Sequence, residues 1–150
     1  MPLSTASCET RMTTESNGLL DTNILILRRR IDHNELPDIV SISAVTLAEL
    51  SAGPHHTSNV EERARRLDVL QRAEAEFDPL PFDAEAARAF GRVTTAVLTA
   101  GRKPRGRVAD LMIASVAISH RLPLFTTNPD DFEGMTELLT VIPVKRPSDL

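Results

Sequence analysis

The chain has 150 residues, of which 41% are hydrophobic and 25% charged, and a formal net charge of −4. This length is enough for one domain with a core of its own. The negative charge argues against a protein that binds nucleic acid through bulk positive charge. With five Phe and no Trp or Tyr, an aromatic platform for stacking single-stranded bases is excluded as well.

The N-terminal region is polar and small. Residues 1–17 contain no apolar run of the signal-peptide type, and no apolar run in the chain reaches the roughly 20 residues that span a bilayer. The single cysteine, Cys8, cannot form an internal disulfide, which fits a reducing cytoplasm. We therefore expect a cytoplasmic protein without membrane contact. It should have a flexible N-terminal tail over residues 1–17, with an alternative start at Met12, and one domain over residues 18–150.

Short apolar runs then alternate with longer helical patterns, which predicts βα units around a mostly parallel sheet. Strands are expected over residues 18–21, 39–42, 80–82, 123–126 and 138–142. Helices are expected over residues 24–32, from the N-cap Ser43 to about 53, over 60–77, from the N-cap Asp83 to 101, and over 108–119.

Two of these helices have distinct patterns. Helix 108–119 is apolar on nearly every side, which predicts a buried helix. Helix 60–77 has charges on one face and apolar residues at helical spacing on the other, which predicts an amphipathic surface helix. Its expected apolar positions are Val60, Ala64, Leu67, Leu70, Ala73 and Phe77.

Four acidic residues lie beside apolar segments, where a carboxylate is costly to bury unless it is paired or bound to a cation. Asp21 and the loop with Asp131 follow strands, whereas Glu49 and Asp110 lie near the starts of helices. A ligand crevice in an open α/β sheet forms beyond the carboxyl ends of the strands. We therefore expect all four side chains to converge on one crevice.

Four carboxylates in one crevice repel each other unless a cation neutralises them. Oxygen ligands suit Mg²⁺ or Mn²⁺, and such ions can polarise a phosphodiester and supply hydroxide. The leading interpretation is a metal-dependent, phosphodiester-cleaving site. A single Asp after a strand is usually only a turn or helix cap, so the inference depends on the complete set.

Four motifs carry a resemblance to a known family. They are Asp21-Thr22-Asn23, Thr46-x-x-Glu49-Leu50, Asp110-Leu111-x-Ile113-Ala114 and Thr127-Asn128-x-x-Asp131-Phe132. Together they resemble the motifs of PIN-domain ribonucleases, and their order and spacing are most similar to the VapC toxins of bacterial toxin–antitoxin modules. The resemblance covers residues 18–142.

This resemblance implies a PIN-like three-layer α/β/α fold, with a central, mostly parallel sheet flanked by helices. It also implies a toxic endoribonuclease with an acidic Mg²⁺ site (Mn²⁺ being the alternative), inhibited by a VapB-like antitoxin. By match, the catalytic and metal-binding residues are Asp21, Glu49, Asp110 and Asp131. Thr22, Asn23, Thr127 and Asn128 match polar positions that would orient metal-bound water. The fourth acidic position stays open between Asn128 and Asp131.

A basic segment precedes Asp110 and contains Arg102, Lys103, Arg105 and Arg107. It is interpreted either as a clamp for RNA phosphates or as a solvated loop, and Arg28, Arg29 and Arg30 are expected to face solvent. A homodimer is expected because two-fold pairing is the commonest oligomer.

Two other functions compete with the nuclease. The first is a catalytically silent PIN-like module that binds RNA or protein, which would have no reason to keep all four acids. The second is an aspartate-nucleophile phosphatase, which would need an acid two residues after Asp21, where the chain has Asn23.

Overall fold

The computed structural model describes residues 16–148. Most of the tail expected over residues 1–17, including Met12, therefore lies outside the described residues. Asn17 already belongs to the first strand, and the backbone N–H of Ile39 donates to the carbonyl of Ser16 at 2.8 Å. The domain thus begins at or before residue 16. Within residues 16–148 no helix is both long and apolar enough to cross a bilayer.

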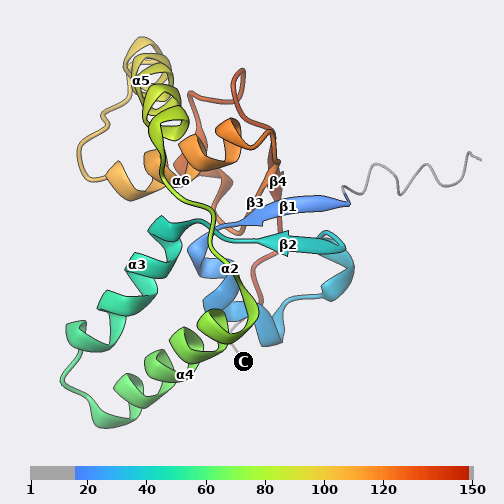
Figure 1. The fold of residues 1–150 in the computed structure, drawn as a ribbon, viewed down its shortest axis with the longest axis vertical. Helices are drawn as coiled ribbons and strands as arrows, with labels where there is room; N and C mark the ends of the chain where they lie inside the picture. The colour runs from blue at the N-terminus through green and yellow to red at the C-terminus, as the bar shows by residue number, and fades with distance from the viewer. Residues whose placement is uncertain (1–15, 149–150) are drawn as a thin grey trace, which may run out of the picture.

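A four-stranded sheet forms the centre of the molecule, in the order β2-β1-β3-β4 with every pairing parallel (Figure 1). The strands are β1 (Asn17–Leu20), β2 (Ile39–Ser41), β3 (Leu124–Thr126) and β4 (Val141–Pro143). The prediction of a mostly parallel sheet is confirmed.

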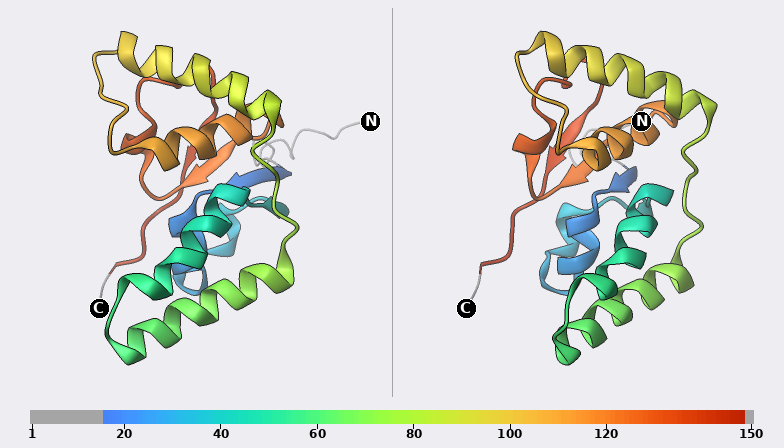
Figure 2. Two further views of the ribbon diagram at one scale, coloured as in Figure 1. Left: turned by 60° about the vertical axis from the view of Figure 1, so that its left-hand side comes forward. Right: turned by 90° about the vertical axis from the view of Figure 1, so that its left-hand side faces the viewer.

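Helices cover both faces of this sheet (Figures 1 and 2). One face carries α2 (Thr22–Leu27), α3 (Ala44–Ala52) and α4 (Val60–Glu76), and the other carries α5 (Ala84–Thr99) and α6 (Val108–Ser119). Successive strand residues point to opposite faces. Leu19 and Leu124 therefore pack with α5 and α6, whereas Leu20 and Phe125 pack with α2, α3 and α4. The result is the expected three-layer α/β/α architecture.

Two predicted strands need correction. Residues 80–82 form no strand, because only Leu80 pairs, in an isolated bridge with Ser43. The last strand begins at Val141 instead of residue 138, since the backbone N–H groups of Leu138 and Leu139 both donate to the carbonyl of Met135 and close a turn there. Leu139 is buried in this turn and packs with α5 and α6.

The first helix also differs from the prediction. It starts at Thr22, directly after β1, and its α-helical part ends at Leu27. A 3₁₀ turn, η1 (Arg28–Arg30), follows, and the N–H of Ile31 donates to the carbonyl of Arg28. Short 3₁₀ turns are common at helix ends. A second turn, η2 (His33–Glu35), leads into β2.

The amphipathic helix α4 covers the predicted span to within one residue, and the C-terminal half of its predicted apolar face packs on the core, whereas the N-terminal half is exposed. Val60 and Leu67 are exposed, whereas Ala73 is buried and Val69 and Leu70 pack against the core. Phe77, the C-cap residue, packs there too.

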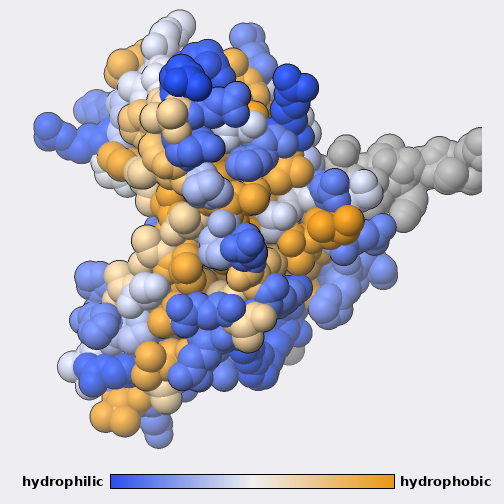
Figure 3. Space-filling model, viewed as in Figure 1, coloured by the Kyte–Doolittle hydropathy of each residue, from blue (hydrophilic) through white to orange (hydrophobic). Residues whose placement is uncertain are grey.

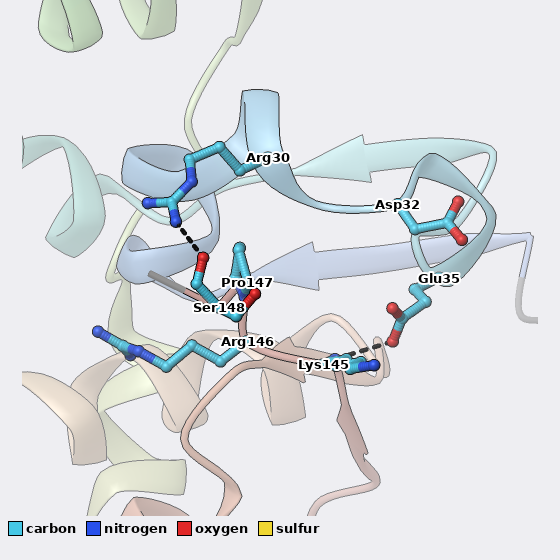
Figure 4. A pocket seen from close by; sticks show the side chains of 7 residues that line it. All are labelled: Arg30, Asp32, Glu35, Lys145, Arg146, Pro147 and Ser148. Carbon is cyan, nitrogen blue, oxygen red and sulfur yellow. Dashed lines mark hydrogen bonds between the residues drawn. The ribbon is translucent and has the colours of Figure 1, made fainter. Parts of the chain in front are cut away.

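The C-terminal segment after β4 is tied to η1 and η2 (Figure 4). Arg30 Nη2 donates to the carbonyl of Ser148 at 2.6 Å, and the N–H of Lys145 donates to Glu35 Oε1 at 2.8 Å. A cavity of about 750 Å³ lies between these segments. The C-terminal segment therefore helps to hold the arginine-rich turn in place.

Candidate active site

The site forms where the order of the strands reverses. β1 has β2 on one side and β3 on the other, although β3 comes about a hundred residues later in the chain. Such a switch point leaves a crevice beyond the carboxyl ends of the two strands. Asp21 directly follows β1, and Asp131 lies in the 3₁₀ turn η4 (Pro129–Phe132), after β3. Both lie at this crevice.

One groove of about 1070 Å³ is lined by all four predicted acids. It runs from Asp21, Glu49, Asp110 and Asp131 along α2, η1 and α4. Figure 3 shows hydrophobic side chains gathered in the waist between the two helical layers, and hydrophilic ones spread over the layers themselves. The predicted convergence of the acids on one crevice is thus found.

Asp21 is the most buried of the four acids, with 4% of its surface exposed. It is the N-cap of α2: its Oδ1 accepts from the N–H of Thr22 at 2.9 Å, and its Oδ2 accepts from Thr126 Oγ1 at 2.7 Å. Burial raises the pKa of Asp21, and these two hydrogen bonds oppose the rise. The charges of Glu49 and Asp131 raise this pKa further.

Asp110 lies in the first turn of α6, as predicted. Burial raises its pKa to about 7, and the charges of the other three carboxylates, that of Asp21 above all, add to this effect. The guanidinium of Arg107 opposes it. The ionised form of Asp110 is therefore disfavoured in this pocket near neutral pH.

Glu49 lies in the second turn of α3 and is exposed. Its Oε1 accepts a hydrogen bond from Thr22 Oγ1 at 2.6 Å, and Thr22 Oγ1 in turn lies 3.0 Å from Thr46 Oγ1. Side chains of α2 and α3, those of Thr22 and Thr46, therefore hold Glu49 in place.

The loop after β3 decides between the two candidates for the fourth acidic position. Asp131 lines the groove and contributes charge to both Asp21 and Asp110. Asn128 does not line the groove; its backbone N–H donates to Thr126 Oγ1 at 2.9 Å. The geometry favours Asp131.

The acids do not form a direct cage for an ion. Among residues 16–148, no three Asp, Glu, His or Cys side chains stand close enough to hold one metal ion, and the mutual repulsion of the carboxylates favours this separation. Mg²⁺, however, keeps several waters and is usually bound through one or two carboxylates. The oxygen-only donors and the raised pKa values of Asp21 and Asp110 fit such a cation.

The polar residues around the acids are only partly those predicted. Thr126 is the fully buried partner of Asp21, whereas Thr127 Oγ1 is buried and has no hydrogen-bond partner among residues 16–148. Adjacent residues at a strand end point to opposite faces. The alternation of side chains along β3 therefore distinguishes Thr126 from Thr127, and the sequence prediction did not use it. Thr46 was also missed, although it stands in the motif with Glu49. Asn23 lines the groove, as does Thr22.

The four cations of the basic segment have different surroundings. Arg102 forms an ion pair with Glu133, and Arg107 Nη1 donates to the carbonyl of Asp131 at 3.1 Å. Lys103 and Arg105 are exposed. None of these four cations lines the groove.

Of the three arginines expected to face solvent, Arg29 and Arg30 are exposed and Arg28 is half-buried, and all three line the groove. Arg28 binds Glu76 at 2.6 Å and lies over the ring of Phe77 at 5.5 Å. It thereby joins η1 to α4. Arg29 and Arg30 line the groove beside it.

Comparison with known proteins agrees with this geometry. The PIN domain family matches residues 18–138. Ribonuclease VapC5 of Mycobacterium tuberculosis is 39% identical over 126 residues, covering 82% of this chain and 90% of the relative. A tRNA(fMet)-specific endonuclease VapC of Shigella flexneri is 34% identical over 131 residues, covering 81% of this chain and 94% of the relative.

Solved structures give the same result. A crystal structure of VapBC-5, a toxin–antitoxin system of M. tuberculosis, contains a chain that matches with a TM-score of 0.75 and 35% identity, covering 87% of this chain and 99% of that one. A chain of DNA-bound VapBC from Salmonella typhimurium matches with a TM-score of 0.64 and 25% identity, covering 85% of this chain and 96% of that one. The chain studied here therefore belongs to the PIN domain family and, within it, to the VapC ribonucleases of toxin–antitoxin modules.

Proposed function

We propose that the nuclease domain, expected over residues 18–150 and joined in the structure by Ser16 and Asn17, hydrolyses RNA phosphodiester bonds at the four-acid pocket with the help of a divalent cation, Mg²⁺ or Mn²⁺. The observation that carries this proposal is that four carboxylates line one switch-point crevice, where burial and their mutual repulsion raise the pKa values of Asp21 and Asp110. A catalytically silent module would gain nothing from this charge, which works against folding.

The residues have separable roles in this proposal. Asp21 and Asp110, the two acids with raised pKa values, would hold the cation, with Glu49 and Asp131 acting on its waters. When bound, the cation would polarise the scissile phosphate and lower the pKa of a bound water. Thr126 and the backbone N–H of Thr22 orient Asp21 and oppose the rise of its pKa, and Arg107 holds the loop of Asp131 beside Asp110.

Cleavage of purified RNA by the purified chain tests the proposal. Activity should be lost on chelation, return with Mg²⁺ or Mn²⁺, and be lost in Asp21→Asn. Asp38→Asn is the matched control, because Asp38 is exposed and precedes β2 at the opposite end of the sheet. Total tRNA is the first substrate to test, given the name of the S. flexneri relative. Chelator-resistant cleavage, or full activity of Asp21→Asn, would refute the metal mechanism.

We further propose that a VapB-like antitoxin inhibits the enzyme by lying in the groove. The groove has an apolar floor beside the acids, which suits an amphipathic helix in the helix-in-groove mode. An arginine from that helix would match the carboxylates in two-pronged geometry. The floor residues are Leu25, Leu50, Val69, Ala73 and Phe77.

Charged side chains of both signs line this groove and would give an antitoxin polar contacts beside the apolar floor. Arg65 and Arg66 pair with Glu62, and Arg72 pairs with Asp68, at 2.8 to 2.9 Å. Because Arg65 and Arg66 share one carboxylate and Arg29 and Arg30 also line the groove, the rim keeps a positive surplus that faces the four acids. Co-purification with the antitoxin should suppress cleavage and protect α2 and α3 from hydrogen exchange; a complex that still cleaves RNA would exclude occlusion. We also propose that the protein acts in the cytoplasm and forms a homodimer.

A further inference from the structure

Three hydroxyl groups form a chain that runs from the buried start of α3 to Glu49. Thr22 Oγ1 donates to Glu49 Oε1 at 2.6 Å, and Thr46 Oγ1 lies 3.0 Å from Thr22 Oγ1. Ser43 Oγ donates to Thr46 Oγ1 over a longer distance, 3.4 Å. Ser43 and Thr46 are fully buried, whereas Glu49 is exposed. The chain thus connects the interior of the domain to an exposed carboxylate.

The hydrogen atoms in this chain have one direction. An ionised carboxylate can only accept hydrogen bonds, and a hydroxyl has one hydrogen to donate. Because Thr22 gives its hydrogen to Glu49, its oxygen must accept from Thr46, which in turn accepts from Ser43. Every hydroxyl therefore donates toward Glu49.

The hydroxyl of Thr46 is not needed to cap α3. The cap bond runs from the N–H of Thr46 to Ser43 Oγ at 3.0 Å, so it involves the backbone of Thr46 and not its side-chain oxygen. A valine at this position would keep the cap and fill nearly the same volume. What it would remove is the donor that orients Thr22.

We propose that Thr46 is a positioning residue of the nuclease: its hydroxyl orients Thr22, which holds Glu49 toward the other three acids. This inference rests on the proposed metal-dependent function. It means that Thr46 affects the affinity for the cation although Thr46 contacts neither the RNA nor the cation. Groups that hold ligand side chains in place commonly change metal affinity when they are removed.

Binding of Mn²⁺ alone to the full chain tests the proposal. Electron paramagnetic resonance measures the free ion and so gives the bound fraction. Thr46→Val should weaken binding about tenfold, the lower end of the usual range for such outer partners, and Thr46→Ser should restore it. The matched control is Thr94→Val in α5, because Thr94 Oγ1 is also buried but has no hydrogen-bond partner among residues 16–148. This control should bind Mn²⁺ as the wild type does.

A double-mutant cycle separates positioning from general damage to the fold. If Thr46 acts through Thr22, then adding Thr46→Val to Thr22→Val should weaken Mn²⁺ binding no further. Independent, additive losses would overturn the inference. Should Thr46→Val fail to fold, Thr46→Ala serves instead, since alanine favours the helix and also lacks the donor.

The outcomes also distinguish this inference from the function on which it rests. Wild-type affinity in Thr46→Val, while the wild type binds Mn²⁺ and cleaves RNA, would refute the role of Thr46 alone. A wild type that neither binds Mn²⁺ nor cleaves RNA would refute the metal-dependent function, and the role of Thr46 with it.

Discussion

Replacing Asp110 with asparagine should stabilise the metal-free protein at neutral and higher pH while abolishing cleavage. The substitution removes the charge and leaves the size of the side chain nearly unchanged. Burial and the neighbouring carboxylates raise the pKa of Asp110 from 3.8 to about 7. At about 1.4 kcal/mol for each tenfold change in proton affinity, this rise corresponds to at most about 4 kcal/mol. Because Asp110 is partly exposed, solvent screening should leave about 2 kcal/mol.

The sign of the pH dependence follows from proton binding. The folded state binds the Asp110 proton more tightly than the unfolded chain does, so this contribution to stability is complete below about pH 4. It is lost as the pH rises through about 7. The advantage of Asp110→Asn over the wild type should therefore be near zero at pH 4 and reach about 2 kcal/mol at pH 8.

Urea unfolding followed by circular dichroism, in the presence of a chelator, measures this difference. In thermal unfolding the same change corresponds to roughly 4–8 °C for a domain of this size. Added Mg²⁺ should stabilise the wild type more than the variant, since binding to the folded state raises stability. An Asp110→Asn protein that is less stable than the wild type at pH 8, or equally stable at every pH, would show that charge is not concentrated at Asp110.

Three further predictions concern the site loop, the basic segment and the sheet. Asp131→Asn should slow RNA cleavage more than Asn128→Ala does, because only Asp131 lines the groove; the reverse order of initial rates would assign the fourth position to Asn128. Neutralising Lys103 and Arg105 should weaken RNA binding and lower the slope of log K against log salt by about 1 to 2. An unchanged slope would show that these residues belong to a solvated loop that does not bind RNA. Gly18→Ala should cost about 1–3 kcal/mol of stability, because its Cβ would overlap the ring of Phe125. The control Gly91→Ala, which meets nothing within 4 Å in α5, should be neutral or stabilising in the same unfolding assay.

The helices were the most predictable part of the fold. Residues 108–119 are helical over the predicted span, and the caps Ser43 and Asp83 accept the expected backbone hydrogen bonds. These features depend on neighbours in the sequence. The strand ends were less predictable: whether Leu80 pairs, and where β4 begins, depends on partners far away in the chain.

In the candidate site, too, features set by nearby residues were predictable and features set by distant residues were not. The convergence of the acids followed from their positions at strand ends and helix starts. The hydroxyl that supports Asp21 did not, because choosing Thr126 over Thr127 requires the register of β3 against β1. The pairing of Arg28 with Glu76 was not visible either, since it depends on how α4 crosses α2.

The wide separation of Asp21 and Thr126 in the chain has a consequence for synthesis. These hydrogen-bonded residues are 105 positions apart, which a ribosome covers in roughly 5–20 seconds at about 5–20 residues per second. β1 has only one of its two neighbours until β3 has been made. A nascent chain therefore carries Asp21 and Glu49 well before β3 supplies Thr126 and completes the surroundings of Asp21.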